Sequence, residues 1–170
     1  MKKTVISLLL APILAFALEI GEVPLHVTLD GDNGGLVSGS AWSSTMLKDK
    51  VYVVFYVDPD EKETNAPLTE ALKAKNFNRD FYGSVAIINM AATWLPNFAI
   101  ASSLKEKQEK FPHTVYVKDL NKVLVKEWNL ADDSSDILVF DKEGKLIYLH
   151  EGKLDDTQIQ KVISLIEQNL

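Results

Sequence analysis

Residues 50–73 read KVYVVFYVDPDEKETNAPLTEALK, and this stretch decides the fold class. Its first part, residues 51–57, consists only of valine and aromatic side chains. A run that is apolar on both faces of an extended chain is typical of a strand buried in the middle of a parallel sheet. The stretch therefore predicts the central strand of an α/β domain.

The predicted strand is followed by an acidic turn and then by a helix. Asp58 and Pro59 end the strand, because proline has no N–H to donate to a neighbouring strand. A helix is predicted to begin near Asn65 and Pro67, since asparagine is a favourable N-cap and proline suits the first turn. In parallel α/β domains, such strand-to-helix turns are where ligands and catalytic groups gather.

The remaining pattern predicts one domain, a mixed sheet with helices on both faces. The expected strands are an N-terminal hairpin over residues 23–42, parallel strands over 85–88 and 114–117, and a second hairpin over 137–150. Two capping boxes predict helix starts, at Ser103-x-x-Glu106 and Asp155-x-x-Gln158. Residues 123–128 fit either a strand or a short helix.

The first 17 residues carry the features of a secretory signal peptide. Lys2 and Lys3 precede an apolar run that ends in the small-residue pattern Ala15-Phe16-Ala17. The run is short for a membrane span, and an N-terminal helix packed on the domain is the alternative. We expect a signal peptide over residues 1–17 and a domain over 18–170. The mature protein would lie in the periplasm of a Gram-negative cell, without stable membrane association.

The composition excludes several classes of function. The formal net charge is −6, and removal of Lys2 and Lys3 with the signal peptide would bring it to −8. Nucleic-acid binding requires clustered Lys and Arg, so we expect no nucleic-acid partner. The chain has no cysteine, which excludes disulfides, a lipid anchor after the cleavage site and thiol redox chemistry.

The order of these elements resembles the thioredoxin-like fold, in its peroxiredoxin and exported-redoxin form, over nearly all of residues 18–170. Short stretches spread along the chain also resemble the YtfJ family of small exported proteins. They include Glu70-Ala71-Leu72-Lys73, Ala101-Ser102-Ser103-Leu104, Trp128-Asn129-Leu130 and Asp141-Lys142-Glu143-Gly144. The resemblance implies a thioredoxin-like α/β fold with an N-terminal β-hairpin extension, and it identifies no activity.

The chain departs from working redoxins at the positions that carry their chemistry. Thioredoxins place a Cys-x-x-Cys pair at the end of the central strand, where the helix N-terminus lowers the thiol pKa. The corresponding residues 58–65 have no thiol. Residues 133–136, where those proteins place a cis-proline, read Asp-Ser-Ser-Asp. We therefore expect neither thiol–disulfide exchange nor peroxidase activity, and we assign no catalytic residue.

Carboxylates gather in the turn that replaces the redox motif. They are Asp58, Asp60, Glu61 and Glu63. One interpretation is a site for a hard cation or a surface for a basic partner, since calcium and magnesium prefer oxygen ligands. The other interpretation is a solvated turn, because Lys62 is interleaved and no glycine provides the sharp bend of a calcium loop.

Two further segments are expected beside this turn. One carries Trp94, Asn97 and Phe98 after the second parallel strand, in a predicted loop over residues 89–99. Its aromatic rings either mark a binding surface or fold back onto the core. The other segment, before the last hairpin, carries Ser134, Ser135 and Asp136. These residues complete the candidate binding surface.

Motifs for other metal-binding, catalytic or phosphate-binding sites are not found at their usual spacing in this sequence. The three histidines, His26, His113 and His150, are far apart in the sequence and show no zinc-binding pattern. There is no Gly-x-Ser-x-Gly elbow and no Walker-type phosphate-binding loop. We therefore expect no metal and no cofactor.

The sequence favours a non-catalytic periplasmic binding or accessory module that recognises a protein or a small ligand through this corner. Fold alone does not decide the function. One alternative is an enzyme of another type, with a cation held at residues 58–63. A second alternative is a transcriptional regulator, which the negative charge disfavours.

Overall fold

The computed structural model describes residues 18–170. The predicted signal peptide, with its Ala15-x-Ala17 pattern, lies outside the described residues. Within residues 18–170, every helix is too short or too polar to cross a membrane.

A six-stranded sheet with the order β2-β6-β5-β4-β7-β8 forms the centre of the molecule. The strands are β2 (Gly34–Leu36), β4 (Val51–Val57), β5 (Tyr82–Asn89), β6 (Thr114–Asp119), β7 (Ser135–Phe140) and β8 (Leu146–His150). Strands β4, β5 and β6 run parallel, whereas β7, β8 and β2 are antiparallel to their neighbours. The apolar stretch at 51–57 is the strand between β5 and β7, and the predicted central, buried strand is confirmed.

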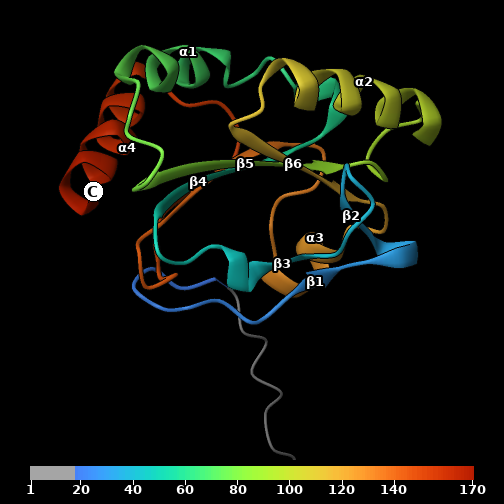
Figure 1. Cartoon of the computed structure of the whole chain (residues 1–170), viewed down its shortest axis with the longest axis horizontal. Helices are drawn as coiled ribbons and strands as arrows, with labels where there is room; N and C mark the ends of the chain where they lie inside the picture. Colours follow the sequence, from blue (N-terminus) through green and yellow to red (C-terminus); the bar gives the residue numbers. More distant parts are fainter. Residues whose placement is uncertain (1–17) are drawn as a thin grey trace, which may run out of the picture.

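Helices cover both faces of this sheet (Figure 1). One face carries α1 (Ala66–Lys75), α2 (Asn97–Lys110) and α4 (Asp156–Asn169). The opposite face carries α3 (Val123–Trp128) and a two-stranded sheet made of β1 (Thr28–Leu29) and β3 (Trp42–Ser43). Trp42 and Trp128 are fully buried beneath the central sheet. The segment that fitted either a strand or a short helix is therefore the helix α3.

The N-terminal hairpin is much shorter than predicted. Only Thr28–Leu29 pairs with β3, and Val23 and Leu25 are about half exposed. Residues 21 and 22 pair with the second hairpin instead: Gly21 N–H donates to Leu146 O, and Leu146 N–H donates to Glu22 O. Between β1 and β3 the chain also adds β2 to the edge of the main sheet.

Helix α2 begins seven residues earlier than predicted, with Pro96 instead of Ser103 at the N-cap. Ser103 and Glu106 lie inside the helix and do not form a capping box, because the helix starts at Asn97 after an extended Pro96. The early start places Ile100 against the sheet, four residues before Leu104, and both side chains join a buried cluster. The second predicted capping box is confirmed, since Asp155 and Gln158 bond reciprocally at the start of α4.

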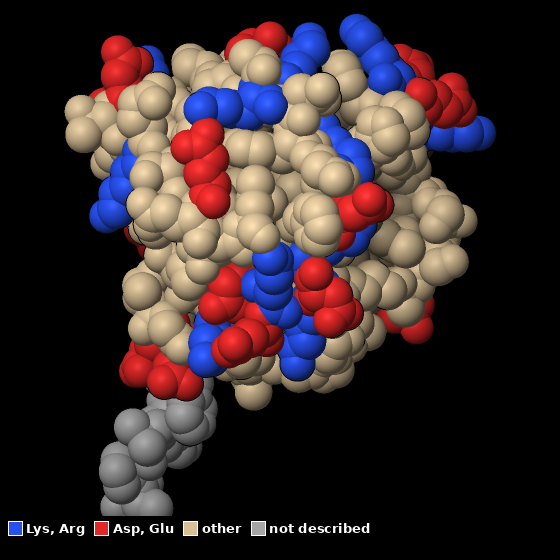
Figure 2. Space-filling model, turned by 60° about the vertical axis from the view of Figure 1, so that its left-hand side comes forward, with Lys and Arg blue, Asp and Glu red and all other residues tan. Residues whose placement is uncertain are grey.

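The surface charges are mixed on the face seen in Figure 2. Basic and acidic side chains lie next to one another there, and no extended patch of one sign is seen. A basic stripe that follows a nucleic-acid backbone is therefore absent from this face of the described structure.

Candidate binding site at the carboxyl ends of the parallel strands

The ends of β4, β5 and β6 and the start of β7 meet at one edge of the sheet. Asp58 follows β4, Asn89 ends β5, Asp119 ends β6 and Ser135 opens β7. All four residues are buried, with exposed fractions of 4% or less. The parallel arrangement brings these polar side chains together although they are far apart in sequence. We call this edge, together with the acidic turn at residues 58–63 and the connection after β5, the acidic corner.

Asp58 is turned into the protein and stabilises the turn after β4. Its carboxylate Oδ1 accepts a hydrogen bond of 2.8 Å from Asp60 N–H, which caps the 3₁₀ helix η3 (Pro59–Glu61). Its own N–H donates to Ser134 O at 2.9 Å. Burial raises the pKa of Asp58, and nearby Asp60, Asp133 and Glu61 raise it further. Asp58 therefore has a structural role at the corner.

The other carboxylates of the turn point in different directions. Asp60 is exposed and accepts a hydrogen bond of 2.9 Å from Thr93 Oγ1, whereas Glu61 accepts one from Thr64 Oγ1. Glu63 is exposed. Across residues 18–170, no three His, Asp or Glu side chains gather in a way that would hold a metal ion. In this turn, Asp60 and Glu63 are therefore exposed as separate carboxylates and not grouped as metal ligands.

The Thr93–Asp60 bond joins the acidic turn to an exposed aromatic pair. Trp94 is 86% exposed and Phe98 is 79% exposed. Trp94 lies in the connection after β5, and Phe98 lies in the first turn of α2, not in a loop as predicted. Asn97 is exposed beside it. Of the two interpretations of the aromatic pair, folding back onto the core is excluded.

The first two residues of β7 are internal, whereas Ser134 before them is partly exposed. Ser135 is 2% exposed and Asp136 is fully buried, so neither belongs to the exposed surface that the sequence predicted. Asp136 accepts hydrogen bonds from Ser134 Oγ at 2.7 Å and from Ala131 N–H at 2.9 Å. Burial nevertheless raises the pKa of Asp136 to about 6. The start of β7 therefore contributes buried polar groups to the acidic corner and no exposed binding group.

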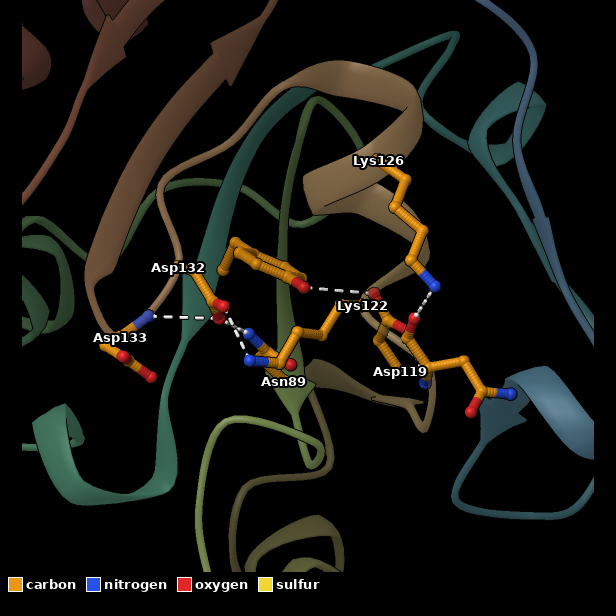
Figure 3. A network of polar contacts seen from close by, with 8 residues as sticks. Asn89, Asp119, Lys122, Lys126, Asp132 and Asp133 are labelled. Carbon is orange, nitrogen blue, oxygen red and sulfur yellow. Dashed lines mark hydrogen bonds and ion pairs between the residues drawn. The ribbon is translucent and has the colours of Figure 1, made fainter.

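A further polar network borders the corner and was not predicted (Figure 3). Asn89 Nδ2 donates to Asp132 Oδ1 at 2.9 Å, and Lys122 Nζ donates to Asp132 Oδ2 at 2.5 Å. The bond to Lys122 is the main cause of the lowered pKa of Asp132. Asn89 Oδ1 is buried without a hydrogen-bond partner among the described residues.

Asp119 is also a structural residue. Its carboxylate accepts hydrogen bonds from the backbone N–H groups of Val123 and Leu124 at 2.9 and 3.0 Å, and from Tyr56 O–H at 3.0 Å. It therefore satisfies two free donors at the start of α3 and fixes that helix against β4. The only sequence signal for this role is an acidic residue four positions before the segment at 123–128, which fitted either a strand or a short helix.

The family model described as "Bacterial protein of unknown function (YtfJ_HI0045)" matches residues 26–169. The chain belongs to the YtfJ family. The protein YtfJ of Escherichia coli (strain K12), called uncharacterized, is 30% identical over 179 aligned positions, which cover 97% of this chain and 95% of the relative. The family resemblance inferred from short stretches is thus confirmed over nearly the whole chain.

Solved structures show the fold of this YtfJ-family protein. The exposed lipoprotein thioredoxin Etrx1 of Streptococcus pneumoniae strain TIGR4 is similar with a TM-score of 0.58 and 16% identity, covering 85% of this chain and 99% of that one. A thiol peroxidase from Chromobacterium violaceum is similar with a TM-score of 0.62 and 14% identity, covering 94% and 93%. The predicted thioredoxin-like fold is confirmed. The YtfJ-family chain has no cysteine with which to carry out thiol chemistry.

Proposed function

We propose that this YtfJ-family protein is an exported, non-catalytic binding module that holds a basic segment of another periplasmic protein at the acidic corner. The observation that carries the proposal is the 2.9 Å bond between Thr93 Oγ1 and Asp60 Oδ2. It holds an exposed carboxylate beside the connection that carries Trp94, 86% exposed, and this connection leads into α2 with Phe98, 79% exposed.

Such a surface fits a segment in which Lys or Arg alternates with apolar side chains. Aromatic side chains contribute strongly to protein interfaces, and Lys or Arg stacks favourably on the face of a tryptophan. Carboxylates at the rim attract a basic partner and raise the association rate. The signal-peptide pattern over residues 1–17 supports a periplasmic partner.

Fluorescence of Trp94 gives a direct test. Trp42 and Trp128 are each 1% exposed, so a change in emission on binding reports mainly on Trp94. The titrant is a synthetic peptide of Lys, Arg and Leu, and its matched control has Glu at every basic position. We expect the basic peptide to shift the emission saturably. In Asp60→Lys we expect roughly tenfold weaker binding, which corresponds to about 1.4 kcal/mol.

The matched control variant is Glu70→Lys, which makes the same change in charge at an exposed position on α1. It should bind the basic peptide as the wild type does. Equal binding of the acidic peptide, or an unchanged affinity in Asp60→Lys, would contradict the proposed recognition chemistry.

A further inference from the structure

A basic pocket lies at the opposite edge of the sheet, where the parallel strands begin. Its volume is about 170 Å³. The side chains that carry the argument come from the starts of β4, β5 and β6 and the segments before them: Lys50, Tyr52, Arg79, Tyr82, Ser84 and His113. The pocket is therefore separate from the acidic corner at the other ends of the same strands.

The charge of this pocket is opposite to that of the chain. Lys50, Arg79 and His113 converge on it from three separate segments, and no acidic residue lines it. Arg79 is the single arginine in a protein with a net charge of −6. Among residues 18–170, no carboxylate forms an ion pair with Lys50 or Arg79. Asp49 and Asp80 are next to these residues in sequence but do not line the pocket.

The basic side chains are positioned by contacts that leave donors free. Lys50 Nζ donates to the backbone carbonyl of Arg79 at 2.5 Å, which ties the two basic segments together. The guanidinium carbon of Arg79 lies 5.2 Å from the centre of the Tyr82 ring, a cation–π contact that does not use its N–H groups. The guanidinium therefore keeps its N–H donors for another ligand.

The pocket wall also requires a glycine. A Cβ atom on Gly83 would lie 2.3 Å from Cε1 of Tyr52, so the absence of a side chain leaves room for this ring. Ser84 Oγ, which is 2.9 Å from Thr114 Oγ1, adds a hydroxyl to the lining. The pocket is thus lined by two tyrosine rings, a serine hydroxyl and three basic groups.

We propose that this pocket binds the phosphate group of a small ligand. A guanidinium presents a planar set of donors that matches the oxygens of a phosphate, and an ammonium adds a point charge. The double negative charge of a phosphate can use Lys50, Arg79 and His113 together, whereas a single carboxylate cannot. This inference is independent of the proposed function, since the two sites share no residue.

Titration of the purified protein with inorganic phosphate tests the inference. Backbone amide resonances are followed by NMR, at constant ionic strength maintained with chloride. We expect saturable shifts at the starts of β4, β5 and β6, and no comparable shifts with chloride alone. Acetate should bind at least threefold more weakly than phosphate.

Arg79→Gln is the decisive variant, and we expect it to weaken phosphate binding at least tenfold. His113→Gln, at an exposed position, should weaken it less. Lys62→Gln removes one charge from the acidic turn and should leave phosphate affinity unchanged. An amide spectrum of each variant, recorded without phosphate, serves as the control that the variant is folded. Shifts that do not saturate, an unchanged phosphate affinity in Arg79→Gln, or acetate binding as tight as phosphate would overturn the proposal.

Discussion

Replacing Asn65 with alanine is expected to destabilise the protein by about 3 kcal/mol, because a buried side chain that joins three segments is lost. Asn65 Nδ2 donates to the backbone carbonyls of Ser135 and Gly152, and Asn65 Oδ1 accepts from Leu154 N–H, each at 3.0 Å. The variant removes the partners of these three backbone groups, of which those of Ser135 and Leu154 are buried. Chemical denaturation at neutral pH measures the change in the free energy of unfolding.

Asn97→Ala is the matched control for this substitution. Asn97 is exposed at the first position of α2, and its replacement should change the stability by no more than about 0.5 kcal/mol. A loss below about 1 kcal/mol in Asn65→Ala would show that these segments are held together in another way.

The second large effect concerns Asp136 and pH. Burial raises the pKa of Asp136 from 3.8 to about 6, so the folded protein keeps a proton that the unfolded chain loses. The stabilisation from this proton is fully present below about pH 4 and is lost as the pH rises through about 6. The Asn side chain in Asp136→Asn does not titrate. Relative to this variant, the free energy of unfolding of the wild type should fall by up to about 3 kcal/mol between pH 4 and pH 7.

Denaturation of both proteins at several pH values provides the measurement. Groups common to both proteins cancel in the difference between their free energies of unfolding. Asp60→Asn, which changes an exposed carboxylate, should track the wild type across the same range. A difference between the wild type and Asp136→Asn that stays constant from pH 4 to pH 7 would show that Asp136 does not retain the proton.

Sequence patterns predicted the elements whose signals are local. The buried strand at Val51–Val57 is apolar on both faces, and the start of α4 carries a reciprocal capping pair. The predicted start of α2 was wrong because Ser103 and Glu106 have the spacing of a capping box but lie inside the helix. That helix begins at Asn97, and the earlier start allows Ile100 to pack against the sheet.

The polar contacts of the corner could not be predicted, because their partners are distant in sequence. Asn65 was predicted to cap α1, but its side chain makes no cap bond and reaches residues 70 to 89 positions away. Asn89 and Asp132 are 43 positions apart. The exposure of Trp94 and Phe98 was likewise left open by the sequence, since an aromatic pair after a strand is compatible with both core and surface.

Site-specific photo-crosslinking in cells tests the central proposal, recognition of a periplasmic protein at the acidic corner, most directly. A photoreactive amino acid replaces Phe98 in the full chain, and the control carries it at Phe111, the 41% exposed aromatic at the other end of α2. The proposal predicts a covalent adduct with a periplasmic protein from position 98 that is lost when Asp60→Lys is added. No adduct from position 98, or equal adducts from both positions, would contradict it.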